Sequence, residues 1–350
     1  MITIEQTDFP ALRDEWLALE EGGHVPTVFQ TYDWMDSWWK HLGFRGRKLI
    51  LAAREDGDLI GIAPIYVSRM TVKGVPLFNV ARLIGHGESD YNAFILKKGH
   101  EGPALKALLR HLRPFKWDIF WLSDVHSETA TNSLVTGILK ELGYHYYSQR
   151  HTPCPYIKLP GSYEDYLRGL SGSVRRNTLN YARRLEKAGV LNLSKTKREH
   201  CNEDMRYFFM LHEKRWKYNW LEGALNGKAL KQFHVEASAR LSRYLSLHFL
   251  ELNGKRIACE YSYDFNGVVF NYLRGMDMEY RHYRPGNIIL LKLIERAINA
   301  GMVEIDFMRG DEEYKFHFTK TSRQNMKYLF SGSSLKLKTF KIIENMGTKK

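Results

Sequence analysis

Two Asn-Gly dipeptides between three apolar stretches constrain the fold of this sequence more than any other feature. The stretches are "LSLHFLEL", "KRIACEYSYDF" and "VVFNYLRG", and the dipeptides that separate them are Asn253-Gly254 and Asn266-Gly267. Asn and Gly tolerate the left-handed backbone of a two-residue hairpin turn, and the flanking stretches carry the β-branched and aromatic residues typical of strands. The pattern therefore predicts three consecutive antiparallel strands over residues 245–275.

A helix and a returning strand are predicted after this meander. "NIILLKLIERAINAG" places apolar residues at helical spacing and ends at Gly301, and "MVEIDFM" is then typical of a strand. The first half shows the same order in a fainter form, with a hairpin around Asp56-Gly57, further strands, the helix "GPALKALLRHLR" and the strand "WDIFWLSDV". This repetition at about half of the chain length predicts a duplicated domain.

The length of 350 residues agrees with two domains, because single hydrophobic cores stop growing at about 250–300 residues. We predict a first domain over residues 1–160 and a second over residues 161–350. The expected fold class is α/β (α+β), in which each domain is a mixed, mostly antiparallel sheet flanked by helices.

Charge is distributed unevenly between the two halves. Residues 1–160 contain 18 Lys and Arg against 18 Asp and Glu, whereas residues 161–350 contain 34 against 21, which accounts for the whole net charge of +13. The second half is therefore expected to face an anionic partner such as nucleic acid, a phosphorylated precursor, a nucleotide cofactor or anionic lipid.

Several other classes of protein lack their sequence signals here. No apolar run approaches the ~20 residues of a membrane span, and the acidic start of the chain does not resemble a signal peptide, so we expect a soluble, cytoplasmic protein. The three cysteines, Cys154, Cys201 and Cys259, are far apart and predict neither disulfides nor a metal site. The motifs of phosphate-loop NTPases, zincins and α/β-hydrolases are missing from the sequence.

The loop before the second-half helix, "EYRHYRPGNIILL", has the composition of a phosphate site. A helix N-terminus offers unpaired N–H groups and partial positive charge, here at Gly286 and Asn287, and glycine lets a ligand approach the backbone closely. Arg281 and Arg284 would add two full charges. The same residues would also suit an ordinary helix entry with its arginines in solvent.

Three stretches together carry a family resemblance, and the basic segment "VRRNTLNYARRLEKAG" accompanies them. They are "LHEKRW", "YRPGNIILLKLIERAINAG" and "DFMRGDEEYKFHF". The combination resembles the CelD/BcsL-type acetyltransferases, a branch of the GNAT superfamily associated with exopolysaccharide or cellulose production. Arg281-x-x-Arg284-x-Gly286 is a partial match to the Q/R-x-x-G-x-G/A acyl-CoA loop of that superfamily, with Arg284 in place of the first glycine. Related Fem-type peptidyltransferases are also built from tandem GNAT-like domains and use aminoacyl-tRNA.

This resemblance implies where the chemistry would lie. In GNAT folds two neighbouring strands part and hold the pantetheine arm of acyl-CoA, and here these would be residues 268–275 and 302–307. The charges after Ile305 would then line the reaction site. The pair Tyr314-Lys315 followed by Phe318 resembles the F-K-x-x-F pattern of Fem-type enzymes, which implies that Lys315 stabilises an oxyanion or a phosphate. The alternative is a surface lysine.

Two carboxylates in predicted strands are candidate bases. Glu260 lies in mid-strand, where burial would raise its pKa, so it is either a general base or a salt-bridged residue. Asp306 shares a strand face with an apolar neighbour and either acts as a base or pairs with Arg309 or Arg274.

Other polar residues are candidates for the acceptor site. Tyr272 and Arg274 lie on the third strand, and Arg309 and Asp311 follow the returning strand, where Asp311 belongs to a charge run that also suits a solvated turn. The remaining candidates are His212, Arg215 and Trp216 on one predicted helical face, and His86 and Asp90 in a Gly-rich loop of the first half. Core packing by the first group and ordinary hydrogen bonds in the second are the alternatives.

Three functions are compatible with these residues. The first is an acyl-CoA-dependent N- or O-acyltransferase acting on a sugar, polysaccharide or cell-envelope precursor, with a degenerate first domain on the acceptor side and the second domain binding the acyl donor. The second is a Fem-like transferase that uses aminoacyl-tRNA. The third is a non-catalytic protein that binds nucleic acid or another polyanion through a basic helix with Arg175, Arg176, Arg183, Arg184 and Lys187.

Overall fold

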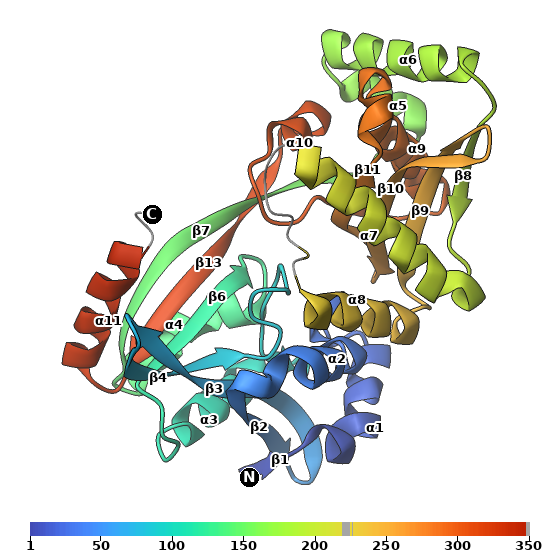
Figure 1. Ribbon diagram of the computed structural model, residues 1–350. Coiled ribbons are helices and arrows are strands. Elements are labelled where there is room, and N and C mark those ends of the chain that lie inside the picture. Colours follow the sequence, from blue (N-terminus) through green and yellow to red (C-terminus); the bar gives the residue numbers. More distant parts are fainter. Residues whose placement is uncertain (219–224, 226, 348–350) are drawn as a thin grey trace. The chain divides into compact units, whose positions relative to one another are not determined.

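The computed structural model describes residues 1–218, 225 and 227–347, and the chain divides into two compact units (Figure 1). Unit 1 consists of Met1–Thr152 and Gln324–Lys350, and unit 2 consists of Pro153–Arg323. The expected second domain ran from residue 161 to residue 350. By contact the division instead falls at Pro153, and the C-terminal residues group with unit 1 because strand β13 (Ser322–Ser331) pairs with strand β6 (Ile119–His126).

Unit 1 contains a mixed sheet in the order β1-β2-β3-β4-β6-β13 with helices packed against it. Its other strands are β1 (Ile2–Thr7), β2 (Gly46–Glu55), β3 (Asp58–Val72), β4 (Val75–Leu83) and β5 (Ile95–Leu96). Its helices are α1 (Phe9–Glu21), α2 (Tyr32–Leu42), α3 (Glu101–His111), α4 (Ala130–Glu141) and α11 (Ser334–Gly347). The strand β7 (His145–Lys158) begins in unit 1 and continues into unit 2.

The core of unit 1 follows the amphipathic patterns of its helices. Leu105 and Leu109 of α3 and Leu139 of α4 are fully buried against the apolar side chains of β2 and β3. Phe340 of α11 packs with Phe78 of β4 at a ring distance of 5.4 Å in a separate cluster. The apolar stripe of each helix therefore fixes which part of the sheet it covers.

Unit 2 contains a second sheet in the order β7-β12-β11-β10-β9-β8. Its further strands are β8 (Leu191–Lys195), β9 (Leu245–Leu252), β10 (Lys255–Phe265), β11 (Val268–Met276) and β12 (Glu304–Asp306). Its helices are α5 (Tyr163–Gly169), α6 (Gly172–Lys187), α7 (Cys201–Tyr218), α8 (Lys228–Arg240), α9 (Pro285–Asn299) and α10 (Glu313–Phe318), and a 3₁₀ segment, η4 (Met278–Tyr283), precedes α9.

The predicted meander is confirmed. β9, β10 and β11 are antiparallel neighbours, and the turns between them have positive φ at Asn253 (51°) and Asn266 (50°) as well as at the following glycines, as an Asn-Gly hairpin turn requires. α9 starts at Pro285, slightly earlier than predicted, because proline is favoured in the first turn of a helix.

Helices α7 and α9 cover opposite faces of this sheet (Figure 1). Tyr261 of β10 points to α7, where its ring lies 5.2 Å from that of Phe208. Ala258, an odd number of positions away on the same strand, is buried with Ile289 of α9. Glu260 is two positions from Ala258, so its side chain points to the same face as Ala258, where it is completely buried.

Strands β11 and β12 pair in parallel over only three residues. The pairs are Val268 with Glu304, Val269 with Ile305 and Phe270 with Asp306. Beyond Phe270, within the part of the chain that the structure describes, residues 271–276 pair with β10 alone, so this edge of β11 is open. A β-bulge at Tyr272 adds to the irregularity. Unit 1 repeats this arrangement, because β4 and β6 pair in parallel only around Val80 and Ala81.

Candidate active site

A cavity of about 550 Å³ lies where the free end of β11 meets the N-terminus of α9. Its walls come from α6, α7, β11, η4, α9 and α10, so distant parts of the unit 2 sequence meet there. The lining residues are Tyr181, Arg215, Arg274, Gly275, Met276, Arg281, His282, Arg284, Gly286, Asn287 and Tyr314. Four of them are arginines and none is acidic, so the cavity attracts anions.

The entrance to α9 combines these charges with a helix N-terminus. Arg281 and Arg284 are exposed, and Arg284 has a left-handed backbone (φ 52°, ψ 52°) immediately before Pro285. A Cβ at Gly286 would lie 3.9 Å from a guanidinium nitrogen of Arg274, and apart from its chain neighbours and its own helix backbone no other atom of the described residues would lie within 4 Å. The backbone at Gly286 is therefore open toward the cavity, as a close-approaching phosphate needs.

Arg274 is held at the cavity wall by a buried ion pair. Its guanidinium lies 2.8 Å from Oε1 of Glu260, whose side chain is completely buried, and the Asn271 side chain donates to Oε2 of Glu260 at 3.0 Å. Burial raises the pKa of the Glu260 carboxyl, while Arg274 and Asn271 oppose that shift. Glu260 does not line the cavity. The geometry thus corresponds to the salt-bridged alternative for Glu260, and Arg274 pairs with Glu260 rather than with Asp306.

Tyr314 and Arg215 complete the cavity beside Arg274. The guanidinium carbon of Arg274 lies 3.9 Å from the centre of the Tyr314 ring. Arg215 of α7 is largely buried, and this burial, followed by repulsion from Arg274, lowers the pKa of its guanidinium. These three predicted site residues therefore line the same cavity as the predicted residues at the start of α9.

His212 contacts the backbone of Arg274 and does not line the cavity. Its Nδ1 lies 2.8 Å from the carbonyl oxygen of Arg274, so the ring donates from Nδ1, and burial lowers its pKa to about 4. Its Nε2 has no hydrogen-bond partner among the described residues. The ring of Trp216 lies 6.0 Å from that of His212 and is half-buried. Of the predicted helical face, only Arg215 reaches the cavity.

Lys315 lies on the short helix α10, and its side chain reaches the loop after β12 rather than the cavity. Its ammonium donates to the carbonyl of Arg309 at 2.8 Å, with the carbonyls of Met308 and Gly310 at 3.4 and 3.5 Å, and it pairs with Glu312 at 2.8 Å. Only 3% of the residue is exposed. Neither a surface lysine nor a cavity lysine is observed, and the ammonium instead holds together a loop with positive φ at Met308 and Gly310.

Asp306 is fully buried and stabilises the start of the same loop. Its Oδ1 accepts from the backbone N–H of Met308 at 2.7 Å, and its Oδ2 lies 3.7 Å from Arg323, which also bonds Glu304 at 2.6 Å. The sequence suggested a base or a pair with Arg309 or Arg274, and the ion pair seen here is with Arg323. The partner comes from β13, a strand that the sequence analysis did not predict.

The remaining predicted residues lie elsewhere. Asp311 is exposed, and Tyr272 packs with its ring 5.7 Å from that of His234. In unit 1, His86 lies 3.2 Å from the Ser123 hydroxyl, and the backbone carbonyl of Asp90 accepts from Asn325. These residues do not line the unit 2 cavity.

The cavity also contains residues that sequence reasoning missed. Tyr181 of α6 lies 5.6 Å beneath the Arg284 guanidinium, and Met276 and His282 flank it in the lining. Of these three, only Tyr181 could have been found from the sequence. It lies on the same side of α6 as Thr178 and Leu185, which are the buried residues of that helix.

Residues 172–316 match the model of the acetyltransferase (GNAT) domain family. This stretch, which makes up most of unit 2, is therefore similar to a GNAT domain. The match includes every residue that lines the unit 2 cavity, and it spans less than half of the chain. No curated protein matches the chain.

Solved structures share the fold of this protein over nearly the whole chain. The crystal structure of FemX superimposes with a TM-score of 0.65 at 12% identity, covering 93% of this chain and 96% of FemX. A conserved protein of unknown function from Bacteroides thetaiotaomicron gives 0.59 at 14% identity, covering 95% and 100%. L-PGS from Bacillus licheniformis gives 0.53 at 12% identity, covering 90% and 96%. The predicted fold class is confirmed, and the GNAT domain together with this fold supports an acyltransferase.

Two further features concern the residues that the structure describes. Among them, no helix is both long enough and apolar enough to cross a membrane. Within the same residues, no group of three or more His, Cys, Asp or Glu side chains is arranged to hold a metal ion.

Proposed function

We propose that unit 2 is an acyl-CoA-dependent N- or O-acyltransferase domain, with acetyl-CoA or another acyl-CoA as co-substrate. The observation that carries this proposal is the open edge of β11 after Phe270 beside an arginine-lined cavity at the N-terminus of α9. The open edge offers backbone groups to an extended pantetheine arm, and the arginines and helix N-terminus suit the phosphates of CoA. A sugar, polysaccharide or cell-envelope precursor is the acceptor class that the CelD/BcsL resemblance favours.

The residues of the chain have distinct proposed roles in this reaction. Arg281, Arg284 and the backbone N–H of Gly286 bind phosphate oxygens. Asn287 contributes through its side chain in the cavity lining, because its backbone N–H donates to the Arg284 carbonyl at 3.0 Å. Bound acyl-CoA would supply an activated thioester. The chain then needs to position an acceptor amine or hydroxyl, which loses one proton, while the departing thiolate gains one. Tyr314 is the proposed proton donor to the departing thiol, because its ring lies at the cavity wall against Arg274.

Positioning residues surround these groups. Glu260 holds the Arg274 guanidinium, and His212 holds the Arg274 backbone. Lys315 and Asp306 order the loop that leads into α10, the helix that carries Tyr314. Their burial suits this indirect role better than proton transfer with a substrate.

A Fem-like function with aminoacyl-tRNA is the second candidate. Five basic residues of α6 are exposed, as binding to the phosphates of tRNA would need. These residues are Arg175, Arg176, Arg183, Arg184 and Lys187. FemX shares the fold over 93% of this chain.

Ligand-dependent stability separates the two candidates. A ligand at about 100 times its dissociation constant adds about 2.7 kcal/mol, so CoA and acetyl-CoA should raise the melting temperature clearly. The variant Arg281→Gln/Arg284→Gln should lose this shift, whereas the matched variant Arg175→Gln/Arg176→Gln should keep it. A CoA shift that survives in the first variant, or no shift in the unmodified protein, contradicts the acyl-CoA proposal. Loss of aminoacyl-tRNA binding only in the second variant would favour the Fem-like function.

A further inference from the structure

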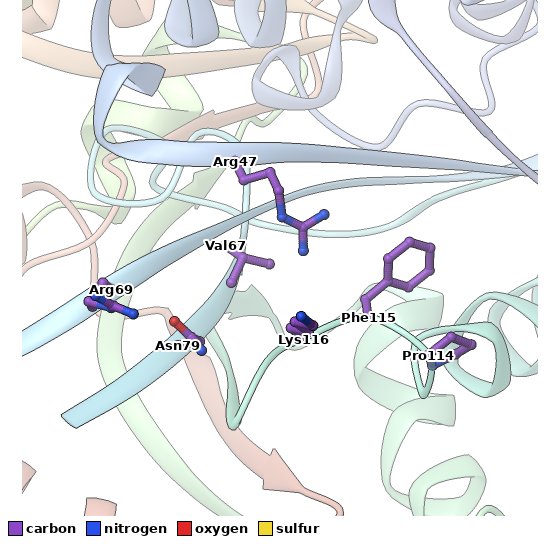
Figure 2. Close-up of a pocket in the computed structure, with 7 residues that line it drawn as sticks. All are labelled: Arg47, Val67, Arg69, Asn79, Pro114, Phe115 and Lys116. Carbon is purple, nitrogen blue, oxygen red and sulfur yellow. The ribbon is translucent and has the colours of Figure 1, made fainter. Parts of the chain in front are cut away.

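Unit 1 contains a second cavity of about 550 Å³, on one face of strands β2, β3 and β4 and below the loop that precedes β6 (Figure 2). It is lined by Arg47, Val67, Arg69, Asn79, Pro114, Phe115 and Lys116. None of these residues is acidic and three carry positive charge. Residues 1–160 as a whole are electrically balanced, so this concentration of charge is local.

The register of the sheet explains how the charges meet. Arg47 is paired with Val67, and Arg69 is paired with Asn79. Because Val67 and Arg69 are two positions apart on one strand, all four side chains point to the same face. Arg47 and Arg69 are thus diagonal neighbours, close enough for like charges to repel.

The three cations have no counter-charge in the described part of the chain. Arg47, Arg69 and Lys116 are exposed and form no ion pair or side-chain hydrogen bond there. The acidic residue that follows the loop, Asp118, is engaged elsewhere, since it accepts from the Asn79 backbone at 2.7 Å and pairs with Lys336. An anion bound in the cavity would relieve the repulsion.

We propose that this cavity binds the phosphate group of a ligand that also carries an apolar or aromatic portion. Arginine presents a planar fork of donors that matches phosphate oxygens, and the side-chain amide of Asn79 adds a neutral donor. Figure 2 shows the Arg47 guanidinium reaching into the space between Val67 and Phe115. Val67, Pro114 and Phe115 form an apolar wall next to the charges, and the volume lies within the range of small-molecule sites.

Phenyl phosphate is a suitable soluble probe, because it joins one phosphate to one ring. We would titrate it calorimetrically into the full chain carrying Arg281→Gln/Arg284→Gln, so that the cationic cavity of unit 2 does not contribute. Inorganic phosphate is the comparison ligand. Co-sedimentation with phosphatidylglycerol vesicles tests whether the phosphate belongs to a lipid headgroup rather than to a soluble compound.

Three further changes in that background test the residues. Arg47→Gln/Arg69→Gln/Lys116→Gln should weaken phenyl phosphate binding about a thousandfold, at about tenfold for each of the three lost charge-assisted contacts. Phe115→Ala should abolish the preference for phenyl phosphate over inorganic phosphate. Arg110→Gln, an exposed position on α3, is the matched control and should bind normally.

The source of the phosphate follows from which probe binds. Binding of phenyl phosphate without vesicles supports a soluble ligand, and triple-variant-sensitive binding of vesicles supports a lipid headgroup. The proposal is overturned if the triple variant, with an unchanged melting temperature, binds like the Arg110→Gln control. It is equally overturned if neither probe binds.

Discussion

Replacing Arg284 by glycine should weaken ligand binding without lowering stability. Arg284 has φ 52° and ψ 52°, a left-handed conformation that costs a residue with a side chain about 1–2 kcal/mol, whereas glycine adopts it freely. Glycine makes the unfolded chain more flexible, which costs about 0.5–1 kcal/mol, and the contact of Arg284 with the Tyr181 ring at 5.6 Å is lost. The free energy of unfolding should therefore stay level or rise slightly.

Arg281→Gly is the matched control for this substitution. Arg281 is also exposed and lines the same cavity, but its φ is not positive, so glycine brings the entropic cost without any relief of strain. Only Arg284→Gly also loses the contact with Tyr181, worth about 0.5–1 kcal/mol, so Arg284→Gly should be about 0.5–1 kcal/mol more stable than Arg281→Gly. In a unit of this size, each kcal/mol corresponds to about 2–4 °C in melting temperature.

Thermal and urea unfolding of the two variants check the expected difference. Both variants should bind CoA about tenfold more weakly than the unmodified protein, because each loses one charged phosphate contact. Equal stability of the two variants, or lower stability of Arg284→Gly, would refute the strain argument. The proposed contribution of the two arginine charges to CoA binding would then be tested by the CoA titration alone.

Other perturbations of unit 2 test its buried polar groups. Lys315→Met should lower the free energy of unfolding by about 2–3 kcal/mol, because the loop carbonyls lose their donor, and urea unfolding that shows no loss contradicts this structural role. Burial depresses the pKa of three histidines, to about 4 for His212 and about 3 for His234 and His248, so the unfolded chain takes up their protons first. The contribution of these three histidines to the free energy of unfolding should thus be constant above about pH 6.5 and fall below it by up to about 4 kcal/mol per pH unit, and urea midpoints that do not change between pH 7.5 and pH 5.5 would be inconsistent with this. Gly275→Ala should cost about 1–3 kcal/mol, because its Cβ would lie 2.7 Å from the His212 backbone nitrogen, and a normal melting temperature would exclude so close a contact.

The sheet of unit 2 was predictable because its signals are local. Asn253-Gly254 and Asn266-Gly267 fix both the turns and the register of the strands beside them, so the predicted limits of β9 and β10 agree with the structure. The parting of β11 and β12 came from the family resemblance rather than from residue patterns. It holds in the structure after Phe270.

The roles of buried charges were less accessible to sequence reasoning. Lys315 and Asp306 lie in a segment whose charges suggested catalysis, yet their partners are loop carbonyls and Arg323. Backbone carbonyl groups are present at every residue, so the sequence does not show which of them a lysine will bind. Arg323 approaches Asp306 only because of a strand pairing between segments far apart in the sequence, and such pairings have no local signature.

The path of the chain through the two units has a consequence for its synthesis. Unit 2 is one continuous segment, whereas the sheet of unit 1 needs β13, which leaves the ribosome only after all of unit 2 has been made. A nascent chain could complete unit 2 while the edge of β6 still awaits its neighbour. Premature termination after Arg323 would therefore damage the unit that is translated first and spare the one translated second.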